Sequence, residues 1–199
     1  MKAISDLAGL YPGETIWIVS KGPSLGNLRA HHFGSGPIIT INEAILFVQD
    51  FGLANPIYSM QKDGCGILSP HERCIVQPPN FQQMVKPRHD IPVILQEPGY
   101  SQFCLADYPH RIMMNLHDDF GLLNSENSIR VCVRIGQLMG CREIVFMCCD
   151  SLANGDLGSY DFGVPKHPGN AAFYATAASL VREDVKDIAH KFLTPEKPQ

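Results

Sequence analysis

The chain has 199 residues, of which 45% are hydrophobic and 18% charged. This composition fits one globular domain with a sizeable core and excludes an intrinsically disordered chain. Its 16 basic and 20 acidic residues give a formal charge of −4, so we expect no nucleic-acid or anionic-membrane partner. No apolar run reaches the roughly 18 residues of a membrane span, and the N-terminus has no long apolar segment, so we expect a cytoplasmic protein.

Cysteine usage predicts neither disulfides nor a structural metal site. The seven cysteines are an odd number without a C-x-x-C pair, and most lie in apolar stretches, which is typical of reduced core thiols. Cys148 and Cys149 are adjacent, so their side chains would point to opposite faces of a strand. The carboxylates of Asp118 and Asp119 diverge in the same way, and we expect no bound metal.

The first quarter of the chain predicts two strand–turn–helix units. Residues 15–19 (TIWIV) form an apolar run that ends in a turn, after which Ser24 could cap a short helix to about Arg29. A second run at 37–41 stops at Asn42, and apolar residues then recur at helical spacing over 44–48.

Later runs predict further strands and two long helices. Strands are expected at 57–60, 74–76, 93–95, 112–114 and 144–147. One helix is expected from about 126 to 139, with Asn124 or Ser125 as its N-cap. Another is expected from 170 to 192, with Asp184 and its charged neighbours on the solvated face. Residues 62–73 and 151–169 are expected to be loops, the second a lid, and 195–199 a flexible tail.

Strands that alternate with helices predict an α/β fold: a three-layer, mostly parallel Rossmann-like sheet with helices on both faces and a short lid loop. Because no repeat or linker interrupts the pattern, we expect one nucleotide-binding α/β domain over residues 1–194. Ligands of such sheets bind at the carboxyl ends of the strands.

Polar residues follow the first two predicted strands at that edge. Gly22 and Pro23 would let the backbone approach a ligand, and Ser24 could donate to a phosphate or ribose. The spacing fits neither G-x-x-x-x-G-K-[ST] nor G-x-G-x-x-G, so an ordinary strand-to-helix turn is the alternative. Asn42 could read a nucleotide or sugar through its amide, or cap the following helix.

Two later segments bring more polar groups to the same edge. Asn127 and Ser128 lie at the start of a predicted helix, whose unpaired amides could meet an anion or serve only in capping. Asp150 follows the strand predicted at 144–147, and the loop after it contains Tyr160 and His167.

Together these motifs resemble the bacterial sialyltransferases built on one nucleotide-binding α/β domain. The resemblance spans about residues 15–190 and rests on GPSL at 22–25, Ile41-Asn42, Asn127-Ser128 ahead of GCREI at 140–144, Asp150, Asn154-Gly155 and Ser159-Tyr160. The GPSL motif also resembles the start of the pterin pyrophosphokinase-like family, so it marks a superfamily.

The resemblance implies an inverting, metal-independent glycosyltransferase with a CMP-sugar donor and a glycan or other small acceptor. It implies a nucleotide site formed by Gly22, Pro23, Ser24, Asn42, Asn127, Ser128 and Asp150. It further implies that Tyr160 and Ser128 steady the leaving phosphate and that His167, three residues before Asn170, is the general base, since a histidine can take a proton near neutral pH. A solvated loop histidine is the alternative for His167. No cofactor besides the donor is implied, and a homo-oligomer stays open.

Several residues depart from the family pattern. Lys21 replaces an asparagine, Ile129 a glycine and Leu152 a second tyrosine, and six residues separate Tyr160 from His167, which predicts a shortened lid. These departures leave two alternatives: a pyrophosphokinase-like phosphotransferase that uses ATP and Mg²⁺, favoured by Lys21, or a catalytically degenerate nucleotide-binding module.

Overall fold

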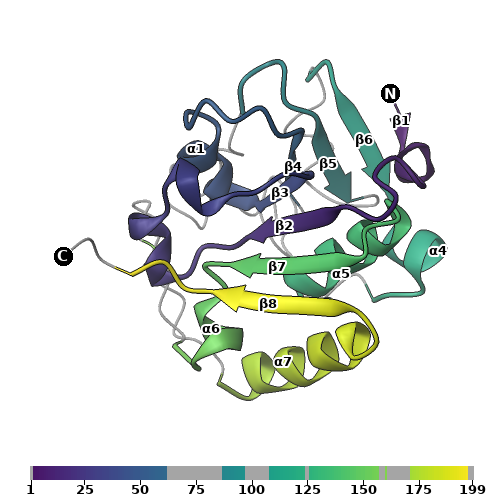
Figure 1. Cartoon of the computed structure of the whole chain (residues 1–199). Helices are drawn as coiled ribbons and strands as arrows, with labels where there is room; N and C mark the ends of the chain where they lie inside the picture. Colours follow the sequence, from purple (N-terminus) through teal and green to yellow (C-terminus); the bar gives the residue numbers. More distant parts are fainter. Residues whose placement is uncertain are drawn as a thin grey trace, which may run out of the picture.

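The computed structural model describes residues 2–61, 87–96, 108–123, 126–156, 160 and 171–196. Within these residues, eight strands form one sheet in which all neighbours are parallel (Figure 1). Their order is β1-β6-β5-β4-β3-β2-β7-β8. The strands are β1 (Lys2–Ala3), β2 (Thr15–Val19), β3 (Ile38–Ile41), β4 (Ile57–Gln61), β5 (Val93–Gln96), β6 (Arg111–Met114), β7 (Glu143–Met147) and β8 (Ala189–Leu193).

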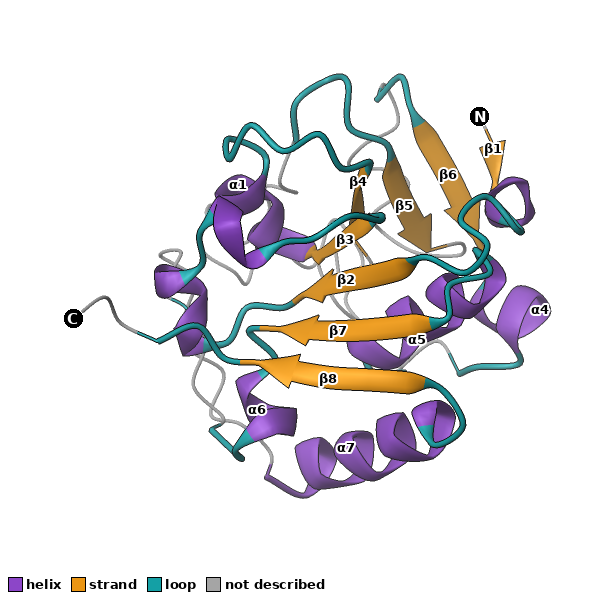
Figure 2. Ribbon diagram, viewed as in Figure 1, coloured by secondary structure: helices purple, strands orange, loops and turns teal. Residues whose placement is uncertain are grey.

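Helices lie on both faces of this sheet, which confirms the predicted three-layer, Rossmann-like α/β class (Figure 2). The α helices are α1 (Ile45–Val48), α4 (Leu116–Phe120), α5 (Ser128–Leu138), α6 (Asp150–Ala153) and α7 (Ala171–Val185). The 3₁₀ helices are η1 (Ile4–Leu7), η2 (Pro23–Asn27), η3 (Ala30–His32) and η4 (Asn42–Ala44). Among the described helices, none has the length and apolar character that a membrane span needs.

The side chains of β2 divide the core into two clusters. Ile16 and Ile18 pack into the larger cluster, together with side chains of α5 and α7. Trp17 and Val19 belong to a second cluster, which includes residues of η2 and α1. Burial on both faces explains why the strand is an unbroken apolar run, as parallel sheets require. Trp17 is a core residue, and its Nε1 donates to the Ser35 carbonyl at 2.9 Å.

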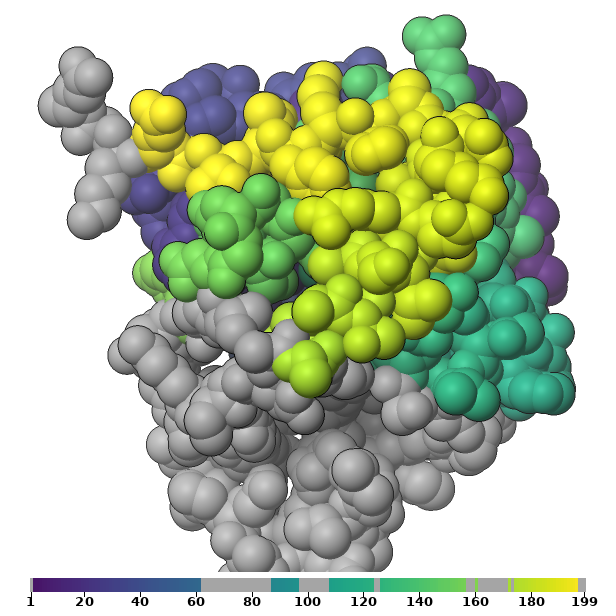
Figure 3. All heavy atoms as spheres, turned by 90° about the horizontal axis from the view of Figure 1, so that it is seen from below, coloured from purple at the N-terminus to yellow at the C-terminus, as the bar shows by residue number. Residues whose placement is uncertain are grey.

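The C-terminal region departs from the sequence prediction. The helix predicted over 170–192 ends at Val185, and Ala189–Leu193 forms β8, which pairs in parallel with β7. Ile188 and Phe192 are four residues apart, a spacing that puts two side chains on one face of a helix and equally on one face of a strand. Phe192 stacks on Phe146 of β7, with ring centroids 4.8 Å apart. Figure 3 shows α7 and β8 side by side, next to α6.

Three predicted boundaries also shift. The helix expected from Ser24 to Arg29 is the 3₁₀ helix Pro23–Asn27. The helix expected from 126 starts at Ser128 with Asn127 as its N-cap, in place of Asn124 or Ser125, and the start of the predicted lid is the helical turn α6. The strand predicted at 74–76, the loop at 62–73 and most of the lid lie outside the described residues.

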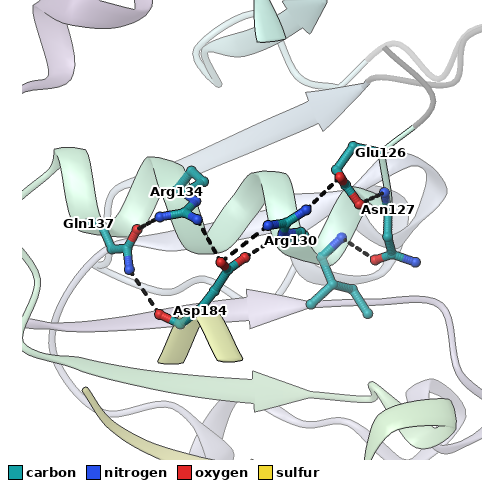
Figure 4. A network of polar contacts seen from close by, with 7 residues as sticks. Glu126, Asn127, Arg130, Arg134, Gln137 and Asp184 are labelled. Atoms are coloured by element: carbon teal, nitrogen blue, oxygen red, sulfur yellow. Dashed lines mark hydrogen bonds and ion pairs between the residues drawn. The ribbon is translucent and has the colours of Figure 1, made fainter. Parts of the chain in front are cut away.

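A polar network joins α5 to α7 (Figure 4). Asp184 was expected on a solvated helix face, but its side chain is only 5% exposed. Its carboxylate accepts from Arg130 Nε and Arg134 Nη2, each at 2.6 Å. Gln137 donates to the Asp184 carbonyl at 3.2 Å, and Glu126 pairs with Arg130 at 2.7 Å. The network therefore holds the start of α5, which carries Asn127 and Ser128, against the C-terminal helix.

Replacing Asp184 by alanine should lower the free energy of unfolding by about 2–3 kcal/mol, because two guanidinium groups lose their shared anion. The cost stays below that of a fully buried pair because Arg130 and Arg134 remain in part open to water. Chemical denaturation measures the change. The exposed Asp187→Ala is the matched control and should cost far less; equal costs would contradict the role given to Asp184.

Candidate functional site

The strand order places a topological switch between β2 and β7. After β2 the chain builds β3 and β4 on one side, and it returns later to place β7 and β8 on the other. The loops that leave two such strands diverge at their carboxyl ends, and ligands of parallel sheets bind there. β2, β7 and β8 all end at the left of Figure 1. The residues after β2 and β7, and those after the neighbouring β3, therefore define the candidate site.

The turn after β2 is tied to the start of α6. Asp150 is 3% exposed, and its Oδ2 accepts from Ser24 Oγ at 2.8 Å and from Ser24 N at 3.3 Å. Gly22 N donates to the Cys148 carbonyl at 2.9 Å. A Cβ on Gly22 would overlap Asp150 Oδ2 and lie 2.5 Å from the Cys148 carbonyl oxygen, so the close approach needs glycine. The structure thus brings together Gly22, Ser24 and Asp150, and Ser24 directs both of its donors to Asp150.

Backbone strain marks the ends of both neighbours of β2. Among the described residues, Asn42 (φ 50°) and Cys148 (φ 55°) are the non-glycine residues with positive φ. Asn42 follows β3, and Cys148 follows β7. Asparagine tolerates this region, whereas for other side chains it costs roughly 1–2 kcal/mol. Residues held in such conformations cluster at ligand sites, where surrounding contacts fix them.

Asn42 is the N-cap residue of neither helix that follows it. The N-cap residues of η4 and α1 are Ile41 and Ala44, and the Asn42 carbonyl accepts from the N–H of Ile45. Of the two roles open for Asn42, capping is therefore not the one seen, and the ligand-reading role stays a prediction.

The cysteine at this edge is not an activated nucleophile. Burial raises the pKa of Cys148 to about 12, and the hydrogen bond with Ser24 offsets only part of that effect. Burial likewise raises the pKa of Cys149. The two side chains pack into different hydrophobic clusters, on opposite faces of the sheet as predicted. The described cysteines are free thiols.

Tyr160 is anchored beside the turn after β2. Its N–H donates to the Lys21 carbonyl at 2.7 Å, and its ring packs edge-on against Phe47 with centroids 5.6 Å apart. A Cβ on Gly26 would lie 3.0 Å from the Tyr160 ring, so the ring also packs against η2. The structure therefore brings Tyr160 to the Gly22 turn. His167 and Asn170 lie outside the described residues.

Asn127 and Ser128 occupy the start of α5. Asn127 Oδ1 accepts from Ile129 N at 2.9 Å, so this side chain caps the helix. The strands beneath α5 point toward its Asn127 end (Figure 4), which puts Asn127 and Ser128 at the carboxyl edge of the sheet. Ile129 and Leu152, two of the positions at which the sequence departs from the sialyltransferase pattern, are both buried in the larger cluster. Neither side chain is free to line a site.

Two contacts at this edge were missed from the sequence. Lys21 Nζ lies 2.6 Å from Glu43 Oε2, so an ion pair bridges the ends of β2 and β3. The sequence signal that could have revealed this ion pair is a pair of opposite charges, each two residues after the end of one of two neighbouring strands. Asn27 donates to the Pro195 carbonyl at 3.1 Å, and Pro195, expected to begin a flexible tail, is buried against this edge.

The described residues contain no group of three or more His, Cys, Asp or Glu side chains that could hold a metal ion. Asp119 instead accepts from the backbone N–H of Asn115 at 2.6 Å, and Asp118 contacts His117.

Comparison with solved structures finds similarity to the sialyltransferase CstII from Campylobacter jejuni. One such structure, in complex with the substrate analogue cytidine-5′-monophosphate, aligns with a TM-score of 0.49 and 12% identity over 94% of this chain and 82% of its own. Another, with a trisaccharide acceptor and CMP, gives 0.46 and 10% over 92% and 82%. Both are of the class that the sequence motifs resemble, and the likeness concerns the fold. No family model and no curated protein matches the chain.

The close approach at Gly22 can be tested by substitution. Gly22→Ala should destabilise the fold by about 1–3 kcal/mol, because the added methyl group displaces Asp150 and the Cys148 backbone. Gly9→Ala is the matched control, since Gly9 has positive φ but open space around it, and it should cost about 1 kcal/mol. Urea denaturation compares the two. A Gly22 variant as stable as wild type would show that the turn is not packed this tightly.

Proposed function

We propose that the chain is a glycosyltransferase that takes a CMP-activated sugar as its donor and binds the nucleotide at the carboxyl edge of β2, β3 and β7. The proposal rests on one observation above all: the positive-φ residues Asn42 and Cys148 directly follow the strands on either side of β2, and β2 itself leads into the Gly22 turn. Strain is concentrated where the strand order predicts a ligand.

The contacts at this edge suggest a division of roles. Gly22 and Pro23 offer close backbone approach to the nucleotide, while Ser24 and Asp150 hold the turn through their mutual hydrogen bonds. Asn42 would read the base or ribose, since an amide both donates and accepts. Asn127 and Ser128 would bring the phosphate to the start of α5, where backbone N–H groups favour an anion.

In the proposed reaction, an acceptor hydroxyl oxygen attacks the anomeric carbon of the donor sugar. A new C–O bond forms as the bond to the CMP phosphate breaks, the phosphate leaves with the electron pair, and the base takes the hydroxyl proton. A single displacement of this kind inverts the anomeric centre. Tyr160 and Ser128 would stabilise the leaving phosphate without a metal ion, and His167, on the resemblance to sialyltransferases, would be the base.

Nucleotide binding is the first test. Calorimetry and thermal shift with CMP, CDP, UMP, UDP, GDP, AMP and ATP, with and without Mg²⁺, should find a metal-independent preference for cytidine nucleotides. A ligand at 100 times its Kd stabilises the fold by about 2.7 kcal/mol. Asn42→Ala should weaken binding at least about tenfold, the cost of one lost polar contact to a bound ligand. Asn55→Ala is the matched control, because Asn55 lies before β4 and its amide donates to the Gly34 and Gly36 carbonyls before β3, at the amino ends of the strands.

Other results would favour one of the two alternative functions. Binding that requires both ATP and Mg²⁺ would support the phosphotransferase. A cytidine preference without turnover on any activated sugar would support a degenerate binding module.

The base has a separate test. His167→Ala should abolish sugar transfer and leave the Kd for CMP within about twofold, because a base acts on the acceptor hydroxyl and not on the nucleotide. Steady-state kinetics and calorimetry measure the two quantities. His117→Ala, at an exposed histidine of α4, is the control. Equal turnover by wild type and His167→Ala would remove His167 from the mechanism.

A further inference from the structure

The ion pair between Lys21 and Glu43 lies at the carboxyl ends of β2 and β3, two of the three strands that define the candidate site. Lys21 follows β2 and Glu43 follows β3, and these strands are neighbours with Val19 opposite Thr40. Their charged atoms, Nζ and Oε2, are 2.6 Å apart, so the pair spans the two strand ends.

Three residues assigned to the site adjoin this pair. Gly22 follows Lys21 in the chain, Asn42 precedes Glu43, and Tyr160 donates its N–H to the Lys21 carbonyl. A ligand that reaches Gly22, Asn42 and Tyr160 would therefore lie beside the chain segments that carry the ion pair.

Both side chains of the pair are partly exposed, Lys21 by 32% and Glu43 by 22%, but the paired oxygen of Glu43 is not. Glu43 Oε2 is shielded from solvent and, apart from the charge contact with Lys21, accepts no hydrogen bond from the residues that the structure describes. The carboxylate thus depends on the lysine, whereas the lysine can still face a ligand.

We propose that Lys21 is the residue that selects a ligand bearing a phosphate group, and that Glu43 holds Lys21 in place and competes with the phosphate for it. The inference deepens the proposed function and rests on it: the donor is recognised by the charge of its nucleotide phosphate as well as by its base. A lysine ammonium binds phosphate as a point charge, and a neighbouring carboxylate weakens that attraction.

Charge-neutral variants at the two positions have opposite expected effects. Lys21→Met should weaken CMP binding at least about tenfold, the loss expected for one charge-assisted contact, and leave cytidine binding within about twofold. Glu43→Gln should strengthen CMP binding several-fold and leave cytidine unchanged, because the ammonium no longer has a competing anion. In the double variant, Glu43→Gln should have no further effect, since Glu43 acts through Lys21. Isothermal titration calorimetry at fixed ionic strength measures all of these affinities.

Glu183→Gln is the matched control. Glu183 pairs with Lys186 at 2.6 Å on the far end of α7, so this change frees a lysine away from the site and should alter neither affinity. Thermal unfolding of every variant records any loss of stability separately from the change in affinity.

Two results would overturn the inference. Equal changes in CMP and cytidine affinity would mean that the ion pair only holds the ends of β2 and β3 together. Weaker CMP binding by Glu43→Gln would mean that Glu43 itself contacts the ligand.

The test separates this inference from the proposed function. If wild type prefers AMP or ATP, the proposed CMP-sugar function fails. Phosphate selection by Lys21 is then tested by comparing the affinities of the same variants for that nucleotide and for adenosine, with inorganic phosphate as a probe that lacks the base. If cytidine and CMP bind wild type equally well, phosphate selection by Lys21 fails while the cytidine site stands. If none of these compounds binds, both proposals fail.

Discussion

The backbone of Gly22 lies against the carboxylate of Asp150 and the carbonyl of Cys148, and this contact joins the ends of the two central strands. β2 and β7 pair along their whole length, so both strands end at the same level of the carboxyl edge. Gly22 allows the approach, Ser24 fixes it by donating twice to Asp150, and Cys148 accepts a left-handed backbone to complete it. The carboxyl edge is therefore built by the same residues that the sequence motifs assign to a ligand.

The C-terminal strand supports this edge from the other side. The N–H of Cys148 donates to the Leu193 carbonyl, and Asn27 at the end of η2 donates to the Pro195 carbonyl. β8 is in turn held by the stacked rings of Phe146 and Phe192. Because the positive-φ residue after β7 and the helix after β2 both bond to the segment around β8, packing far from the turn helps to fix its geometry.

The fold was largely predictable because parallel strands are buried on both faces and appear as unbroken apolar runs: the bounds of β2 were predicted to the residue, and those of β7 to within one. β8 was mistaken for helix because Ile188 and Phe192 have a spacing that suits both periods. That Gly22 and Asp150 lie at the same edge was predictable, because each follows a predicted strand of one parallel sheet; that these strands are neighbours was not. The side-chain partners could not be predicted from the sequence, because they depend on the strand register and on which residues come close together in the folded chain. Ser24 bonds to Asp150, Lys21 to Glu43, and Asp184 to α5.

Charge imposes a further condition on this edge. A chain with a formal charge of −4 does not attract a phosphate through its overall field, so capture of the proposed nucleotide would depend on local cations and N–H groups. A free lysine would lose up to about 2 kcal/mol of side-chain entropy when it orders around a ligand. Because Glu43 already orders Lys21, much of that loss occurs during folding instead of binding, although the carboxylate then competes with the ligand for the ammonium group. An ammonium group that is already ordered lowers the entropic cost of binding any ligand that carries a phosphate, and a phosphate is what separates a nucleotide from its nucleoside.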